Sequence, residues 1–376
     1  MNARMNAEVR NAEADAGDAP LLELEDDWES INAWFLEHDL TDGLPIVPPT
    51  QARVAAMTDY VERELGWKAG EVIGTLAPKG GLATIEKIAA NAVMAGCLPE
   101  YMPVLIACVK AVAQPLFNLD AVQTSTHNTS PLPIVNGPVR TAIDLNSGYN
   151  HTGSRWRSTS TIGRALQLTM INVGGTPGSI NIHTQGHIAR FIHCIAENEE
   201  ENPWQPLHVE RGYAADVNAV TVIPACPAAM IDDNGGSQRA KDLLRTLALS
   251  IPYVGNRNTN GEGQPLLILC PQHARLLANG GYSKAEVKRF IWEYGRLPFG
   301  NIPRGNLTSF SQKILKQYAD FDPAFGVPIA EKPEDIVIVV MGGTGTHSLS
   351  VQTRLASQNI TVPIECKDGT PWRVSK

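Results

Sequence analysis

The segments AVTVIPAC (219–226), PLLILCP (265–271) and DIVIVVMGG (335–343) decide how the fold is predicted. Each is a short, continuously apolar run, rich in β-branched residues and bounded by proline or glycine. Strands that are buried on both faces of a sheet have this pattern. The segments SQRAKDLLRTLALS (237–250) and SKAEVKRFIWEYG (283–295) lie between the runs and have helical spacing. The alternation of strands and helices therefore predicts a parallel α/β sheet.

The chain before residue 210 has a different pattern, which predicts a mostly helical N-terminal part. LLELEDDWESINAWFLEHDL (21–40) and TIEKIAANAVMAGC (84–97) carry apolar residues at helical spacing, and a further helix begins at a proline-containing turn near residue 99. Residues 127–163 are rich in Gly, Asn and Thr and show little periodicity. Loops of that length are usually functional. We expect a disordered polar leader over 1–20, a mainly helical part over 21–210 and an α/β part over 211–376.

Composition excludes several classes of protein. The net charge of −8 and the lack of basic runs argue against a nucleic-acid partner, because phosphate backbones require clustered Lys and Arg. No apolar run is long enough to span a membrane, and the first twenty residues lack the apolar core of a secretory signal. We therefore expect a cytoplasmic protein whose six cysteines stay reduced, and the chain contains no CxxC pair.

The stretch HTQGHIARFIHCIAENEEEN (183–202) concentrates His, Cys and Glu. If it is helical, His187, Cys194 and Glu197 lie within about 40° of His183, opposite an Ile and Phe face. This stripe is either the solvated face of an amphipathic helix or the wall of a cleft. No metal is predicted, because the stripe is about 27 Å long whereas zinc ligands lie about 2.0–2.3 Å from the ion. Only His183 and His187 have a chelating spacing, so zinc is not supported and no cofactor is expected.

The ends of the predicted strands form a second candidate site, since open α/β sheets bind ligands where their parallel strands end. After the last strand, Gly342 and Gly343 are followed closely by His347 and Ser348. These residues form either a backbone nest for a carboxylate or phosphate, or merely a tight turn. The ends of the other predicted strands carry Cys226, Asp232, Asp233, Cys270 and His273. We interpret the two cysteines among them as buried small residues.

Cys97 is the candidate nucleophile. It follows Gly96 at a predicted helix junction, where the N-terminal end of the next helix would lower the pKa of a thiol. The alternative is a cysteine that is packed in the turn. We expect His187 or His208 to act as acid or base and Glu197 to orient it.

A further group of residues is expected to hold a substrate. Neutral side chains of the Asn-rich loop suit a small polar molecule, although asparagine often satisfies loop backbone instead. Arg211 is the nearest local partner for the three glutamates at residues 199–201. The expected substrate-binding residues are Asn136, Asn146, Tyr149, Arg211, Gly342, Gly343, His347 and Ser348.

Several stretches resemble a poorly characterised bacterial family whose members accompany, or are fused to, small thiol or selenol proteins with a selenocysteine-Gly-Ser-Cys motif. The resemblance covers about residues 40–350. It is carried by TIEKIAANAVMAGCLPEYMPV, IVNGPVRTAIDLNSGYN, IGRALQLTMINVGG, CIAENEEENPWQPLHVERGY, QHARLLANGGYSKAEVKRFIWE and GGTGTHS. This chain has no Cys-Gly-Ser-Cys stretch. The resemblance implies thiol-dependent chemistry on a small molecule, together with a thiol or selenol partner protein.

These observations favour an enzyme that acts on a small polar, anionic organic molecule. We expect it to cleave a carbon–heteroatom bond by Cys and His chemistry, as a lyase or hydrolase. One alternative is a thiol-dependent oxidoreductase subunit that works with a thiol or selenol partner protein. The other is a non-catalytic subunit that binds a small anion. The sequence is compatible with a homo-oligomer.

Overall fold

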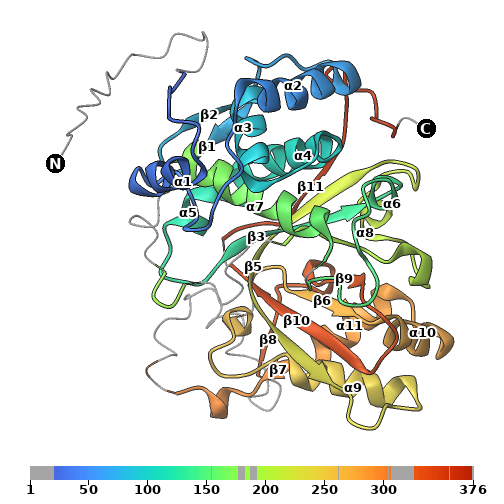
Figure 1. Ribbon diagram of the computed structural model, residues 1–376. Helices are drawn as coiled ribbons and strands as arrows, with labels where there is room; N and C mark the ends of the chain where they lie inside the picture. Colours follow the sequence, from blue (N-terminus) through green and yellow to red (C-terminus); the bar gives the residue numbers. More distant parts are fainter. Residues whose placement is uncertain are drawn as a thin grey trace.

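The fold is a mixed α/β arrangement in which helices pack on a curled seven-stranded sheet (Figure 1). The computed structural model describes residues 21–153, 155–176, 183–186, 193–260, 262–303, 305, 326–354 and 356–374. The strand order is β4-β3-β5-β10-β6-β9, and β11 pairs with β5 off this path. Most neighbouring strands are antiparallel, whereas β3–β4 and β6–β9 are parallel pairs. The strands of this sheet are β3 (Ser130–Asn136), β4 (Ile195–Ala196), β5 (Ala219–Asp232), β6 (Leu266–Leu269), β9 (Val337–Val340), β10 (His347–Thr353) and β11 (Ile360–Pro363).

The strand β5 is the longest of the sheet, at 14 residues, and it changes partners along its length. Its first half pairs with both β3 and β11, and its second half pairs with β10. Ala225 marks the change, because it is the partner of Ser130 in β3 and of Thr353 in β10. The same strand therefore belongs to the upper and the lower part of the molecule in Figure 1.

Among the three strands predicted from sequence, parallel pairing is confirmed for β6 and β9, but the sheet as a whole is mostly antiparallel. β6 and β9 pair in parallel, and β5 runs in the same direction as both, but β10 lies antiparallel between β5 and β6. The sequence prediction missed β10 because three of its buried positions are Ser348, Ser350 and Thr353. Those polar side chains hide the apolar alternation by which a strand is normally found.

The sheet also curls until its two ends meet. The backbone N–H of Asn198, just after β4, donates to the carbonyl of Val340 at the end of β9, at 2.8 Å. These two strands are the ends of the sheet path. The sheet includes strands from both sides of the division that was predicted near residue 210, since β3 and β4 precede it and the others follow.

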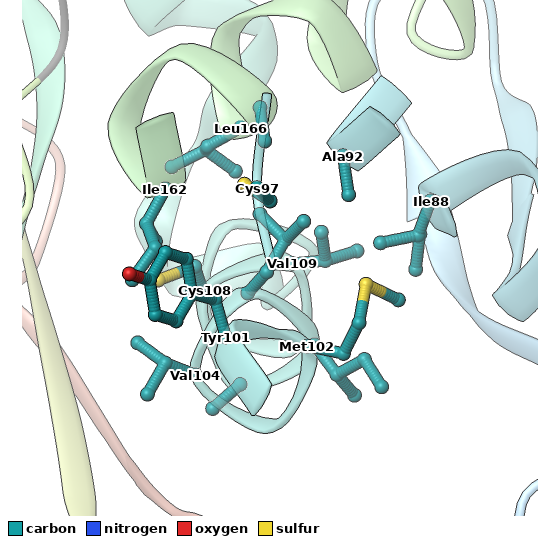
Figure 2. Packing of buried hydrophobic residues seen from close by; sticks show 14 of the residues in the cluster. Ile88, Ala92, Cys97, Tyr101, Met102, Val104, Cys108, Val109, Ile162 and Leu166 are labelled. Carbon is teal, nitrogen blue, oxygen red and sulfur yellow. The ribbon is translucent and has the colours of Figure 1, made fainter. Parts of the chain in front are cut away.

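Helices from the first part of the chain cover one end of the sheet and form the first core. In α3, the Thr84 side chain accepts a hydrogen bond from the N–H of Lys87, and Gly96 ends the helix with a φ of 88°. Cys97, Cys108, Ile162 and their neighbours pack densely there (Figure 2). The helices of this core are α1 (Trp28–Glu37), α2 (Gln51–Leu65), α3 (Ile85–Ala95), α4 (Met102–Val112), α5 (Leu119–Gln123), α6 (Val139–Ala142) and α7 (Arg157–Asn172). The short helix α8 (Leu207–Glu210) instead contributes Leu207 to a separate cluster.

The second core lies between α9 (Ala240–Ser250), α10 (Pro271–Asn279), α11 (Lys284–Tyr294) and the strands β6 and β9. In β9, Ile338 and Val340 face this core, while Val337 and Val339 belong to a third cluster on the other side of the sheet. Burial on both faces explains why the strand is continuously apolar, as predicted. A capping box begins α11, where Ser283 and Glu286 satisfy each other's backbone.

Four short strands form two small separate sheets. β1 (Val72–Leu76) pairs with β2 (Gly81–Thr84), and β7 (Arg296–Leu297) with β8 (Val327–Pro328). The helix predicted over residues 183–202 is wrong from residue 193 onward, where the chain forms β4 and a short 3₁₀ turn. Pairing with β3 outweighs the helical spacing there, and residues 187–192 lie outside the described part.

Within the described residues, no single helix is long and apolar enough to cross a membrane. One bent pair, Pro99–Val112 with Pro115–Gln123, meets the length and composition criteria together, with an angle of 72° between its halves.

The first core includes a side chain from the far end of the chain. Trp372 is 3% exposed and packs in the cluster that the N-terminal helices form. We expect Trp372→Ala to lower the free energy of unfolding by about 3–5 kcal/mol, as large-to-small changes in a core do. The matched control is Trp28→Ala, because Trp28 is 50% exposed. Urea unfolding of both variants measures the difference, and equal small losses would contradict the packing role.

Candidate functional site

Four polar side chains meet where β5, β6 and β9 end and β10 begins. Since these three strands run in one direction, their ends reach the same edge of the sheet, as the sequence prediction required. The cluster, hereafter the strand-end cluster, consists of Asp233, Cys270, His273 and Ser348. Each of them is less than 10% exposed.

Ser348 lies at the centre of the strand-end cluster. Its Oγ is 2.7 Å from Nδ1 of His273 and 4.0 Å from Sγ of Cys270. The same oxygen accepts a hydrogen bond from the backbone N–H of Cys270 at 3.3 Å. A serine hydroxyl has one proton and two lone pairs, so its proton can point to the imidazole or to the sulfur, but not to both at once.

Asp233 faces the other ring nitrogen of His273. The distance between Nε2 of His273 and Oδ2 of Asp233 is 3.8 Å, and Nε2 is buried without a hydrogen-bond partner. Asp233 is fixed by Ser237, whose hydroxyl donates to Oδ1 at 2.8 Å and whose backbone N–H donates to Oδ2. The carboxylate is therefore positioned to favour the tautomer or cation that carries a proton on Nε2.

Burial and hydrogen bonding shift the pKa of the Cys270 thiol in opposite directions. Burial raises the pKa of Cys270, whereas hydrogen bonds from the backbone N–H groups of His273 and Gln272 and from the Ser348 hydroxyl lower it. Those two N–H groups belong to the first turn of α10, for which Cys270 is the N-cap. Burial also lowers the pKa of His273, and the charge of Asp233 opposes that effect.

The hydrogen bonds of the strand-end cluster fit two protonation states. With a neutral thiol, Cys270 Sγ donates to the carbonyl of Gly345 at 2.9 Å and Ser348 donates to His273. If the proton moves from the thiol through Ser348 to Nδ1, Ser348 donates to the thiolate instead and the imidazolium faces Asp233. The arrangement can therefore activate a thiol through a serine and a histidine.

Residues 342–347 contact the strand-end cluster through the carbonyl of Gly345 and are exposed at Thr344 and His347. Nε2 of His347 lies 3.4 Å from Oδ1 of Asp232, and both side chains are exposed. The predicted anion nest is only partly formed, because the N–H of Gly342 already donates to the carbonyl of Ser147 at 2.8 Å. A Cβ at position 343 would lie 2.0 Å from the ring of Tyr149, so a larger residue there would displace that ring.

The Asn-rich loop lies against this glycine segment. His151 lies beside Gly342, and Tyr149, which is 68% exposed, lies over Gly343. The side chain of Asn146 binds its own loop, accepting from the N–H of Gly148 at 3.0 Å and donating to the carbonyl of Tyr149 at 2.9 Å. Asn146 therefore stabilises the loop.

Glu197, His208 and Asn136 lie together in a buried polar network next to β4. Asn136 donates to Glu197 Oε2 at 2.7 Å, and the backbone N–H of Leu207 donates to the same oxygen at 2.8 Å. Burial raises the pKa of Glu197, and it lowers the pKa of His208. All three predicted residues are fully buried, and no described contact joins them to Cys97.

Arg140 supplies the positive charge of this network. It makes a bidentate pair with Glu200 and lies 3.1 Å from Glu199. Glu201 pairs with Arg275. The prediction that Arg211 neutralises these glutamates is therefore wrong: Arg211 is exposed at the end of α8.

The expectation of a reactive Cys97 is wrong. The residue lies at the predicted junction between α3 and α4, but its side chain is 5% exposed among the apolar residues of the first core (Figure 2). Burial raises its pKa to about 12, the opposite of the predicted direction. His187, the other predicted catalytic residue, lies outside the described residues. Among the residues that are described, no group of three or more His, Cys, Asp or Glu side chains could hold a metal ion.

The sequence predicted a candidate site at this edge of the sheet, but it assigned other roles to the four residues of the strand-end cluster. Cys270 and His273 were noted at a strand end, and Cys270 was interpreted as a packing residue. The link between them is Ser348, which was predicted to bind substrate and lies on the missed strand β10. The spacing of Cys270-Pro271-Gln272-His273, directly after an apolar run, is the signal that could have indicated the pair.

Comparisons with known proteins identify no family for this chain. No family model matches the chain, and no curated protein matches it. The resemblance to the bacterial family stays a prediction.

The Glu197 network gives a stability test. Glu197 accepts three hydrogen bonds, from Asn136, Leu207 and Asn202. Glu197→Gln places an NH₂ donor against one of these donors, so we expect it to lower the free energy of unfolding by about 1–3 kcal/mol. Urea denaturation measures the loss, with Glu62→Gln on the exposed face of α2 as the control. An unchanged stability would mean that the three donors are satisfied elsewhere.

His151 gives a pH test. Burial and the nearby His193 lower the pKa of His151 from 6.5 to about 4. Between these two values the unfolded chain binds more protons than the folded chain, so stability falls as the pH decreases through that window. We expect His151→Gln to reduce the loss of stability between about pH 7 and pH 4.5. Urea unfolding at both pH values checks this, and the exposed His38→Gln variant should behave as the unmodified protein does.

Proposed function

We propose that this protein is an enzyme that cleaves a carbon–heteroatom bond of a small polar molecule, with Cys270 as the nucleophile. The observation that carries the proposal is the position of Ser348 Oγ, 2.7 Å from His273 Nδ1 and 4.0 Å from Cys270 Sγ. Asp233 on the far side of the imidazole supports the role of His273 as a base. The proposal keeps the predicted Cys and His chemistry and assigns it to different residues.

The proposed reaction begins with transfer of the thiol proton through Ser348 to His273. The Cys270 sulfur attacks the electrophilic carbon, a carbon–sulfur bond forms, and the bond to the leaving heteroatom breaks. His273 then returns its proton to that heteroatom, and water hydrolyses the covalent intermediate. Because Cys270 is buried, residues 342–347 must move away first while Ser348 stays in place, and this movement breaks the hydrogen bond from Cys270 to Gly345.

Two aspartates near Cys270 bear on the charge of the proposed substrate. Asp233 belongs to the strand-end cluster and Asp232 lies beside it. The negative charges of both carboxylates disfavour an anionic group close to the sulfur of Cys270. The proposed reacting group is therefore neutral. The thiol-dependent oxidoreductase remains the second proposal, and it uses the same thiol with a disulfide as the partner.

The test uses p-nitrophenyl acetate, a small neutral ester. The background is Cys366→Ser, which removes the one cysteine that is not fully buried. We expect release of p-nitrophenolate and an acetyl group on Cys270, located by peptide mass spectrometry. His273→Gln and Ser348→Ala should each slow the release by about 100-fold or more, the scale of general-base catalysis. The matched control is His38→Gln, an exposed histidine of the same chain.

Two results would exclude the hydrolytic proposal. One is acetylation of lysines or other cysteines with Cys270 unmodified, and the other is a rate that His273→Gln leaves unchanged. A mixed disulfide at Cys270 after incubation with oxidised glutathione, without any acetylation, would favour the oxidoreductase.

A further inference from the structure

A cavity of about 350 Å³ lies at the opposite end of β10 from the strand-end cluster. Gln352 contributes to its wall and is four positions along β10 from Ser348, which corresponds to about 13 Å. The cavity is therefore separate from the residues of the proposed reaction. Its polar wall includes His127, Asn128, Cys226, Asn256, Arg257 and Gln352.

Two arginines near this cavity have an unsatisfied nitrogen. Nε of Arg257, in the wall, and Nε of Arg354, close to it, are both buried without a hydrogen-bond partner. Arg354 uses Nη1 to donate to the hydroxyl of Ser125 at 3.0 Å. Within the described residues, neither arginine forms an ion pair with a carboxylate. Both arginines are only partly exposed, and buried polar nitrogens usually have a hydrogen-bond partner, so the two Nε–H groups require an explanation.

The charges around the cavity are of one sign. Arg257 and Arg354 both lower the pKa of His127, in addition to the effect of its burial. Arg257 likewise lowers the pKa of Arg354, again in addition to burial, and the only group that opposes this is the Cys226 thiol. The two guanidiniums therefore repel each other, and the thiol, whose pKa burial raises, is no substitute for a carboxylate.

Uncharged groups lie in the wall and behind it. The Ser125 hydroxyl lies 3.0 Å from Nδ1 of His127, so Arg354, Ser125 and His127 form one connected chain of polar groups. Thr129 lies 3.5 Å from the sulfur of Cys226. The wall thus offers neutral hydrogen-bonding side chains around a positive centre, which is how specific sites for small anions are built.

We propose that this cavity binds a small molecule through a carboxylate or phosphate group, with Arg257 as its direct partner and Arg354 reinforcing the positive charge behind it. A planar guanidinium presents its N–H groups in pairs that match two oxygens of such a group. The cavity volume lies at the lower end of the range of about 300–1,000 Å³ for small-molecule sites, so the ligand is small. This inference does not rest on the proposed thiol chemistry.

The experiment is isothermal titration calorimetry of the full chain with inorganic phosphate and, separately, with succinate. We expect binding of at least one of them, weakened by added salt because the attraction is between charges. Arg257→Gln should weaken binding by about tenfold or more, and Arg354→Gln by a smaller factor. Arg63→Gln is the matched control, because Arg63 is an exposed arginine that pairs with Glu64.

The outcomes are decisive in either direction. Binding that depends on Arg257 supports the site, and the preferred probe tells a phosphate ligand from a carboxylate ligand. Absence of binding to both probes at about 10 mM overturns the proposal, as does an affinity that Arg257→Gln and Arg63→Gln reduce equally. Circular dichroism and urea unfolding confirm that each variant is folded. Loss of Cys270 reactivity with binding retained would refute only the proposed function.

Discussion

The pairing of one long strand with three others is the constraint on which this structure depends. β5 holds β3 and β11 along its first half and β10 along its second half, and Ala225 belongs to both registers. A one-residue slip of β5 would turn its buried side chains to the other face in both halves at once. Because β10 continues to pair with β6, and β6 with β9, the same register also sets where the ends of these strands meet. The geometry of the strand-end cluster follows from it.

β10 connects two regions of opposite character. At its start, the buried Ser348 links a thiol, an imidazole and a carboxylate, and two aspartates make the surroundings negative. At its other end, two arginines that have no carboxylate partner in the described part of the chain make the surroundings positive. The strand therefore separates the strand-end cluster, for which we propose acid–base chemistry, from the cavity that we propose binds an anion. Neither depends on the residues that were first expected to be catalytic.

The apolar strands were predictable, and the site residues were predictable only in part. Three continuously apolar runs gave β5, β6 and β9, because a strand buried on both faces needs no polar position. β10 was missed since Ser348, Ser350 and Thr353 are buried polar residues in a strand. The helix expected around Cys194 failed because two residues of parallel pairing with β3 outweigh local spacing. Cys97 occupies the expected junction, but exposure depends on packing between distant helices, which a local pattern does not contain.

The position of Trp372 also bears on how the chain acquires its structure during synthesis. The core of the N-terminal helices is completed by this side chain and by Ile364, which lies just after β11. A ribosome makes α3 and α4 long before these residues, so the helices emerge with part of their apolar surface uncovered. Contacts between residues so far apart in sequence slow folding. We therefore expect the nascent chain to be vulnerable to aggregation, and dependent on chaperones, until residues 360–372 have emerged.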